Sequence, residues 1–324
     1  MKTSLTTELH EKIREVFTEL ELMIGWEAGF DALHTTPVFI RSADDVGRLT
    51  WGLLCAQNLT TYLGKDLTLM AAARESNKKI GICVKGCDSR SIVGLIQDRL
   101  IERDRLYIIG LPCQGVIDWK KVAARMPISG ISSVRIAGQE VIIEGAAGER
   151  RFDLQELLAR RCLRCLYPNP LISDCVVGET VAPRVKKQDV HQDVAKIEGL
   201  SLQDRLAFWQ QELDRCLRCY ACRNACPFCI CQDRCIAETR DPKWLSQYVK
   251  LPEKFLFHFI HAMHLAGRCT ECGECERVCP MDIPVTLIKE ELNKITAELL
   301  DYEAGLDVNA VPPLVTFNPS ETGL

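Results

Sequence analysis

The sequence predicts an α/β N-terminal domain followed by an all-α, helical domain. Two observations lead to this fold class: a strand–helix–strand pattern within residues 78–113, and apolar residues at helical spacing from about residue 200 to residue 301. A chain of 324 residues is long enough for two such domains. We expect an α/β domain at 1–158, a cysteine-bearing connecting segment at 159–200, the helical domain at 201–302 and a tail at 303–324.

The expected elements of the N-terminal domain follow from the spacing of its apolar residues. Residues 5–20 predict an amphipathic helix, and residues 44–63 predict a second one with Asp44 or Asp45 near its N-cap. The βαβ unit and its flank are predicted as a buried strand at 78–86, a helix at 89–101, a strand at 105–113 and an edge hairpin at 131–145.

Composition narrows the function classes. Lysine and arginine number 40 and aspartate and glutamate 44, so a net charge of −4 gives no reason to expect nucleic-acid binding. No apolar run approaches the roughly 18–20 residues that span a bilayer, and the first residues lack a signal-peptide core, so we expect a cytoplasmic protein. Eighteen cysteines are then expected to stay reduced, and their tight C-x2-C repeats indicate metal binding.

Two cysteine runs near the C-terminus share one spacing. Each fits C-x2-C-x2-C-x3-C-P, the pattern of two-cluster ferredoxins. The two-residue gaps let one loop deliver three thiolates to three iron corners, while the fourth cysteine faces the other cluster. Zinc is the alternative, but zinc sites typically use two C-x2-C pairs. We therefore assign Cys216, Cys219, Cys222 and Cys279 to one 4Fe-4S cluster, and Cys269, Cys272, Cys275 and Cys226 to the other.

Helices are expected to join the two runs. Phe255, Phe259 and Met263 recur at helical spacing and predict a helix that docks into a core. His258, His261 and His264 could share a face of it, either as metal ligands or as packed side chains. This arrangement, over about residues 205–300, resembles the α-helical ferredoxin domains of the heterodisulfide-reductase-C type and of succinate dehydrogenase iron–sulfur proteins. The resemblance implies a relay of single electrons.

A third set of cysteines lies in the N-terminal part. Cys87 and Cys113 each follow a predicted parallel strand, so they should lie at the same edge of the sheet, and Cys162 and Cys165 could fold over them. Four thiolates there would hold a third 4Fe-4S cluster, with Cys175 as a possible replacement for one ligand. Lys85 and Arg90 would offset its negative charge. Cys55 and Cys83 are instead expected to be buried free thiols.

The same segment resembles a known family. Lys85 to Arg90 (KGCDSR), then Gly110, Pro112 and Cys113, and the Cys162-x2-Cys165 pair with Asp174 and Gly178 are similar to the beta subunits of coenzyme F-420-linked hydrogenases and formate dehydrogenases. The resemblance covers about residues 75–180. It implies cofactor contacts by Lys85, Asp88 and Arg90, and a place among the subunits of an anaerobic redox complex.

The expected function is electron transfer without substrate chemistry. The chain has no G-x-G-x-x-G fingerprint and no phosphate-binding loop. We expect a subunit that links a hydrogenase, formate dehydrogenase or flavin dehydrogenase module to a heterodisulfide-reductase-like partner. The alternatives are a catalytic FAD-containing subunit that oxidises or reduces a deazaflavin (F-420) or nicotinamide coenzyme, and a scaffold whose clusters only hold the fold. Three further cysteines could bind another metal, exchange as cluster ligands or pack beside a cluster: Cys229, Cys231 and Cys235.

Overall fold

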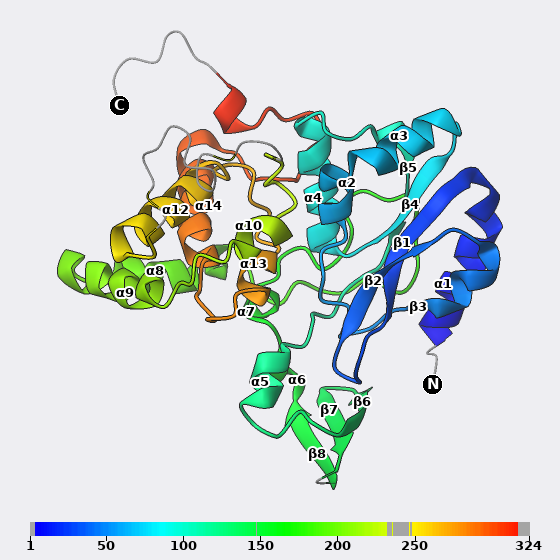
Figure 1. Cartoon of the computed structure of the whole chain (residues 1–324), viewed down its shortest axis with the longest axis horizontal. Coiled ribbons are helices and arrows are strands. Elements are labelled where there is room, and N and C mark those ends of the chain that lie inside the picture. The colour runs from blue at the N-terminus through cyan, green and yellow to red at the C-terminus, as the bar shows by residue number, and fades with distance from the viewer. Residues whose placement is uncertain (1–3, 147, 232–234, 236–245, 247, 317–324) are drawn as a thin grey trace. The chain divides into compact units, whose positions relative to one another are not determined.

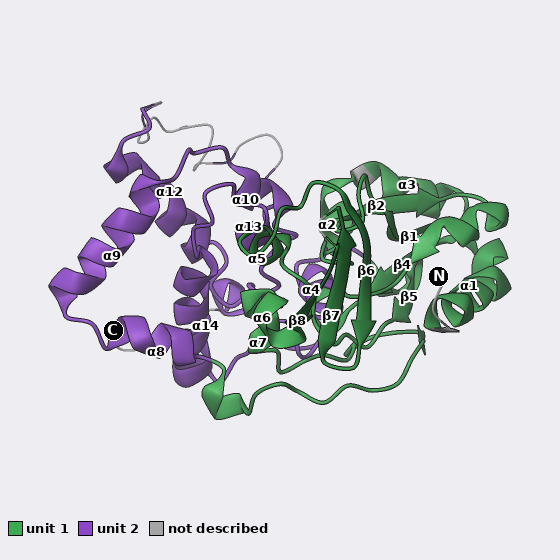
Figure 2. Ribbon diagram, turned by 90° about the horizontal axis from the view of Figure 1, so that it is seen from below, with its two compact units in different colours: residues 1–89, 102–190 green, residues 90–101, 191–324 purple. Residues whose placement is uncertain are grey.

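The structure, a computed structural model, divides into two units. Unit 1 comprises residues 1–89 and 102–190, and unit 2 comprises residues 90–101 and 191–324; Figure 2 colours them green and purple. The structure describes residues 4–146, 148–231, 235, 246 and 248–316.

Unit 1 is built on a mixed six-stranded sheet (Figure 1). Its strand order is β2-β1-β4-β5-β9, with β3 also paired to β1. Strands β1, β4, β5 and β9 run parallel, whereas β2 and β3 are antiparallel to β1. The bounds are β1 Leu20–Ala28, β2 Thr35–Ile40, β3 Leu49–Thr50, β4 Lys79–Val84, β5 Leu106–Gly110 and β9 Cys175–Val176.

The predicted strand–helix–strand unit is confirmed. Strand β4 is apolar and buried beyond its first residue, helix α4 (Gly86–Gln97) follows it, and β5 lies parallel beside β4 with Val84 opposite Gly110. Because both strands end at the same edge, the residues after Val84 and after Gly110 begin side by side. This edge positions the site described below.

Other predictions for unit 1 need correction. The predicted helix 5–20 is confirmed as helix α1 (Ser4–Val16), which a 3₁₀ turn η1 (Phe17–Glu19) extends, whereas the strands β1 and β2 were not predicted. The predicted helix 44–63 is wrong: this stretch forms a 3₁₀ helix η2 (Ala43–Arg48), strand β3, irregular chain and a short helix α2 (Thr60–Lys65). The Ser42 hydroxyl, not an aspartate, is the N-cap and accepts the Asp44 N–H, and Leu49–Thr50 pairs with β1 instead of continuing a helix.

The predicted hairpin is confirmed but belongs to a separate sheet. Three antiparallel strands lie in the order β6-β7-β8. Val141 and Ile143 of β7 pack into a core with Val116 and Leu158, and this core includes Cys162. The bounds here and in the rest of unit 1 are β6 Ile131–Ala137, β7 Glu140–Gly145, β8 Gly148–Asp153, α3 Leu67–Glu75, η3 Arg103–Arg105, α5 Trp119–Ala123, α6 Leu154–Leu157, α7 Arg160–Leu163 and η4 Lys187–Asp189.

The C-terminal region is helical in its described residues. The expected helical pattern at 232–234 and 236–245, and the last part of the tail at 317–324, lie outside those residues. Besides residues 90–97 of α4, unit 2 contains α8 Gln192–Glu198, α9 Leu202–Asp214, α10 Ala221–Ala225, α12 Leu251–Met263, α13 Glu274–Arg277, α14 Thr286–Leu300 and η5 Pro313–Val315.

Helix α12 exists as predicted but buries a different face. Phe259 and Met263 are 48% and 53% exposed, whereas Phe257, His258 and His261 are buried. The buried face therefore carries imidazoles, which hydrogen-bond to nearby thiols as described below. Among the described helices, none has both the length and the apolar character needed to cross a bilayer.

Candidate iron–sulfur centres

The two C-terminal cysteine runs fold into loops with the same backbone pattern. In each loop, the second and the fourth residue after the first cysteine have positive φ: Arg218 (52°) and Tyr220 (59°) in one, Glu271 (55°) and Gly273 (66°) in the other. A short helix begins directly after the second of these residues, α10 in the first loop and α13 in the second. Positive φ is uncommon outside glycine, so its repetition indicates a backbone bent for a specific purpose, here to aim several thiols at one place.

Thiols from the two runs lie together in unit 2. Burial raises the pKa of the Cys216 thiol, and its neighbours Cys279 and Cys219 raise it further. Burial likewise raises the pKa of Cys275, with Cys226 as a neighbouring thiol. The fourth cysteine of each run thus lies near thiols of the other run. All eight cysteines are buried except Cys219, which is exposed.

The proximity of these thiols is compatible with the predicted ligand assignment, in which the fourth cysteine of each run binds the cluster of the other run. This assignment stays a prediction. Burial raises the pKa of Cys269 well above its usual value, and Cys275 and Cys272 are neighbouring thiols that add to this shift. Burial raises the pKa of Cys222 to about 12, and its neighbours include thiols of both proposed groups. Without a metal such thiols stay protonated, so iron would have to displace their protons on binding.

A buried lysine lies among these thiols. Lys289 of α14 is 3% exposed, and its Nζ atom donates to Cys275 Sγ at 3.3 Å. Burial has the largest single effect and lowers the pKa of Lys289, but the negative charges of the surrounding sulfurs as thiolates together outweigh it and raise this pKa, those of Cys275 and Cys226 most among them. The ammonium group is therefore kept charged where the negative charge of a thiolate-ligated cluster would develop. Sequence reasoning missed Lys289, which only α14 brings to the cysteine loops.

Backbone and imidazole donors complete this site. The amides of Arg218 and Ile283 donate to Cys216 and Cys279 at 3.3 and 3.5 Å. His258 Nε2 lies 3.3 Å from Cys216 Sγ, and burial lowers the pKa of His258 to about 3, so its ring is neutral. Hydrogen bonds to sulfur are among the factors that set cluster potentials. Buried thiols, N–H donors and one cation together suit an anionic thiolate-ligated cluster.

The N-terminal thiols also come together, at the carboxyl edge of the main sheet. Cys87 lies directly after β4 and Cys113 after β5, as predicted from the parallel strands. Burial raises the pKa of Cys113 to about 12, and Cys162 and Cys165 are neighbouring thiols that raise it as well. Burial raises the pKa of Cys87 well above its usual value, with Asp88 and Cys113 adding to the shift. Cys113 is therefore close to the other three predicted ligands.

Backbone amides point at this set too. The N–H groups of Gly115 and Val116 donate to Cys113 Sγ and Cys162 Sγ, each at 3.3 Å. Cys175 does not lie with these thiols. It is the first residue of β9, opposite Ile109 of β5, and its thiol is hydrogen-bonded to the Tyr107 side chain. The other two thiols are buried as expected, Cys55 with its pKa raised to about 12 by burial, and Cys83 with its pKa raised by the same cause.

The predicted cofactor contacts divide into two places. Lys85 is buried, and its Nζ atom lies 2.9 Å from Asp88 Oδ2 and donates to the Gln57 carbonyl at 2.8 Å. Burial opposes the charge of Lys85, but Asp88, Cys87 and Cys113 raise its pKa. Arg90 does not join this group. It belongs to unit 2, where its guanidinium donates to the Ala304 carbonyl at 2.7 Å and lies 3.5 Å from Glu303.

Two further features of this site escaped sequence reasoning. The charge of Arg161, which precedes Cys162 on α7, lowers the pKa of Cys87 against the effect of burial. The sequence did contain a signal of this positive charge, because Arg160, Arg161 and Arg164 flank the cysteines of the Cys162-x2-Cys165 pair. Gly86 is also required: a Cβ atom there would lie 1.8 Å from the Tyr167 carbonyl oxygen. The absence of a side chain lets the segment after Cys165 lie close over the turn between β4 and α4.

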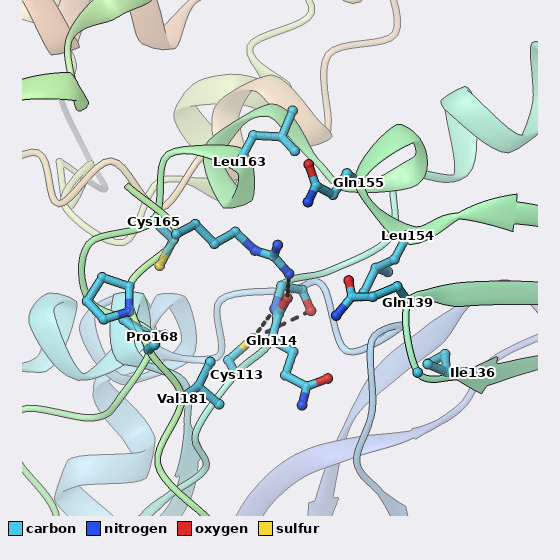
Figure 3. A pocket seen from close by; sticks show the side chains of 15 residues that line it. Cys113, Gln114, Ile136, Gln139, Leu154, Gln155, Leu163, Cys165, Pro168 and Val181 are labelled. Atoms are coloured by element: carbon cyan, nitrogen blue, oxygen red, sulfur yellow. Dashed lines mark hydrogen bonds between the residues drawn. The ribbon is translucent and has the colours of Figure 1, made fainter. Parts of the chain in front are cut away.

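A cavity opens beside two of these thiols. It has a volume of about 640 Å³ and is lined by Cys113 and Cys165 and by Gln114, Gln139 and Arg184, among others. Figure 3 shows Cys113 and Cys165 toward one side, with Gln139 and Leu154 across from them. The Arg184 guanidinium is held by the Gln114 carbonyl at 2.6 Å. The space is large enough for a planar organic molecule next to the thiols.

The family of 4Fe-4S dicluster domains matches residues 212–283, which contain both cysteine loops. The chain carries a 4Fe-4S dicluster domain. The match supports iron–sulfur electron transfer by this part of the chain.

Comparisons also cover the rest of the chain beyond the dicluster domain. The F420-dependent formate dehydrogenase subunit beta of Methanocaldococcus jannaschii is 27% identical over 348 residues, covering 90% of this chain and 89% of that protein. The F420-dependent formate dehydrogenase 1 subunit beta of Methanococcus maripaludis is 25% identical over 362 residues, covering 92% and 90%. A chain of the F420-reducing [NiFe] hydrogenase complex from Methanosarcina barkeri aligns at a TM-score of 0.37 and 15% identity, covering 51% of this chain and 58% of that chain.

Proposed function

We propose that this chain relays electrons through three 4Fe-4S clusters in a formate dehydrogenase- or hydrogenase-type redox complex. The repeated loop geometry around Arg218 and Glu271 carries the proposal for the first two clusters, because it provides two matched sets of converging thiols. The thiols of Cys87, Cys113, Cys162 and Cys165 support the third.

Each proposed centre has the groups that a cluster needs around it. When bound, a 4Fe-4S cluster accepts and releases one electron at a time. The thiols bind the iron, the amides of Gly115 and Val116 stabilise thiolate charge, and Lys85 and Lys289 offset the negative charge of the two regions. Most of these thiols are buried, so water is kept away from them. Solvent access is one of the factors that set the reduction potential of a bound cluster.

The partners follow from the proteins that this chain resembles. The relatives are named as beta subunits of formate dehydrogenases, so we propose that formate dehydrogenase or hydrogenase subunits exchange electrons with one end of the relay. A heterodisulfide-reductase-like subunit is proposed at the other end, from the likeness of the helical ferredoxin domain. We place the complex in the cytoplasm.

A second function is favoured by the cavity at Cys113 and Cys165. A space of about 640 Å³ beside a proposed cluster could hold a flavin or a deazaflavin coenzyme. The relatives are described as F420-dependent, which gives this alternative its substrate class. In this case unit 1 would catalyse electron exchange with the coenzyme, and the clusters would connect it to the partner subunit.

One anaerobic experiment distinguishes the two functions. The isolated full-length protein would be assayed with F420 and with nicotinamide coenzymes, with and without added FAD, after its iron and flavin contents are measured. The relay predicts about twelve irons, reduction by a strong artificial reductant and no coenzyme turnover. Turnover with stoichiometric flavin would support the catalytic alternative, and a preparation with zinc in place of iron would refute both.

A further inference from the structure

A separate group of sulfur and nitrogen atoms lies beside the cysteine loops in unit 2. His261 Nε2 lies 3.1 Å from Cys229 Sγ, and both atoms lie within 4.8 Å of Cys226 Sγ. Cys226 ends the first four-cysteine run, whereas Cys229 and His261 belong to neither run. The proposed clusters therefore give this pair no role.

The pair faces a cavity of about 340 Å³. Two more thiols, those of Cys231 and Cys235, line the same cavity, together with the apolar rings of Phe228 and Phe257. His261 is buried and its ring stacks on Phe257 with centroids 5.7 Å apart, so α12 fixes where the imidazole points. Three thiols and one imidazole thus border one largely apolar space. The exposed Cys231 and the buried Cys235 lie outside the group of ligand atoms within 4.8 Å of one another, so their thiols would have to close on the Cys229–His261 pair to share one ion with it.

We propose that Cys229, Cys231, Cys235 and His261 bind one zinc ion, separate from the 4Fe-4S clusters. Three cysteines and one histidine form a common ligand set of structural zinc sites. Zn–N and Zn–S bonds of about 2.05 and 2.3 Å at a tetrahedral angle hold the nitrogen and sulfur atoms about 3.6 Å apart. The observed separation of 3.1 Å between His261 and Cys229 is already close to this value.

The spacing of the thiols favours a single ion over another cubane. Only one residue separates Cys229 from Cys231, so their thiols reach one metal more readily than two corners of a cluster. The ion would link the segment after Cys226, which carries the three thiols, to His261 of α12. The same helix contacts Cys216 through His258, so the zinc would brace the first cysteine loop at a second point. Zinc has no redox chemistry, and its contribution is therefore structural.

The test uses the full-length protein, purified anaerobically. Zinc and iron are counted by mass spectrometry, and zinc ligands are measured by X-ray absorption at the zinc edge, where iron does not interfere. We expect one zinc per chain, with three sulfur ligands at about 2.3 Å and one nitrogen ligand at about 2.0–2.1 Å. Cys229→Ser and His261→Gln should each lose this zinc while retaining the iron content and cluster spectra of the wild type.

The matched control is His264→Gln. His264 also lines the cavity but is exposed, and the variant should keep the zinc. If the wild type holds no zinc, or if Cys229→Ser and His261→Gln lose iron and alter the cluster spectra instead, the proposal is overturned. Because the zinc edge reads the ligands of the wild type directly, poor folding of a variant does not decide the outcome.

Discussion

Replacing Lys289 by methionine should lower the midpoint potential of the neighbouring cluster. Lys289 Nζ lies 3.3 Å from Cys275 Sγ. Cys275 is a predicted cluster ligand, so an electron added to that cluster would be held close to the ammonium group. Taking about 6 Å as the mean separation and an effective dielectric constant of about 20, one unit charge is worth about 2.8 kcal/mol. For a one-electron couple this corresponds to about 120 mV, since about 59 mV equals a tenfold change. Removing the positive charge makes reduction harder, so the potential becomes more negative.

The measurement is an anaerobic redox titration followed by electron paramagnetic resonance. Methionine keeps the length and apolar stem of lysine, and iron content must first be shown equal to the wild type. Lys294→Met is the matched control, because Lys294 lies on the same helix but pairs with Glu198 at 2.6 Å. If Lys289→Met shifts no cluster by more than Lys294→Met does, then the ammonium group does not act on a cluster and the reasoning fails.

Three further outcomes are expected. Cys113→Ser should lose about four of about twelve irons and keep the dicluster signals, whereas loss of every cluster or of none would contradict a separate third centre. Gly86→Ala should lose the same four irons, because its Cβ would meet the Tyr167 carbonyl. Gly52→Ala, where a Cβ meets nothing within 4 Å, should have the iron content of the wild type. Burial lowers the pKa of His258 to about 3, so its ring stays neutral from pH 6 to 8. The midpoint potential of the adjoining cluster should therefore be the same in redox titrations carried out at pH 6, 7 and 8. A slope near 59 mV per pH unit would show a coupled proton instead.

The sequence by itself determined the chemistry and the strand–helix–strand unit. Metal-ligand spacing is local, so the two C-x2-C-x2-C-x3-C-P runs could be recognised without any tertiary information. Strands β4 and β5 could be predicted because each is a short apolar run followed by a turn. Their parallel pairing then placed Cys87 and Cys113 at one edge of the sheet.

Only the tertiary structure decided which distant groups surround the thiols. Strands β1 and β2 escaped prediction, and the expected helix at 44–63 failed, because sheet pairing with β1 outweighed the local helical pattern. Phe255, Phe259 and Met263 were predicted to dock α12 into a core. Phe255 packs against the core, but Phe259 and Met263 are exposed, and the buried face carries His258 and His261.

The charged partners show the same division. Lys289 reaches Cys275 from 14 residues away in sequence, and Arg90, only five residues after Lys85, belongs to the other unit. Spacing along the chain specifies which residues can bind a metal. Burial and long-range packing determine which charges and hydrogen-bond donors lie next to it, and these contacts are made between segments that carry no common local pattern.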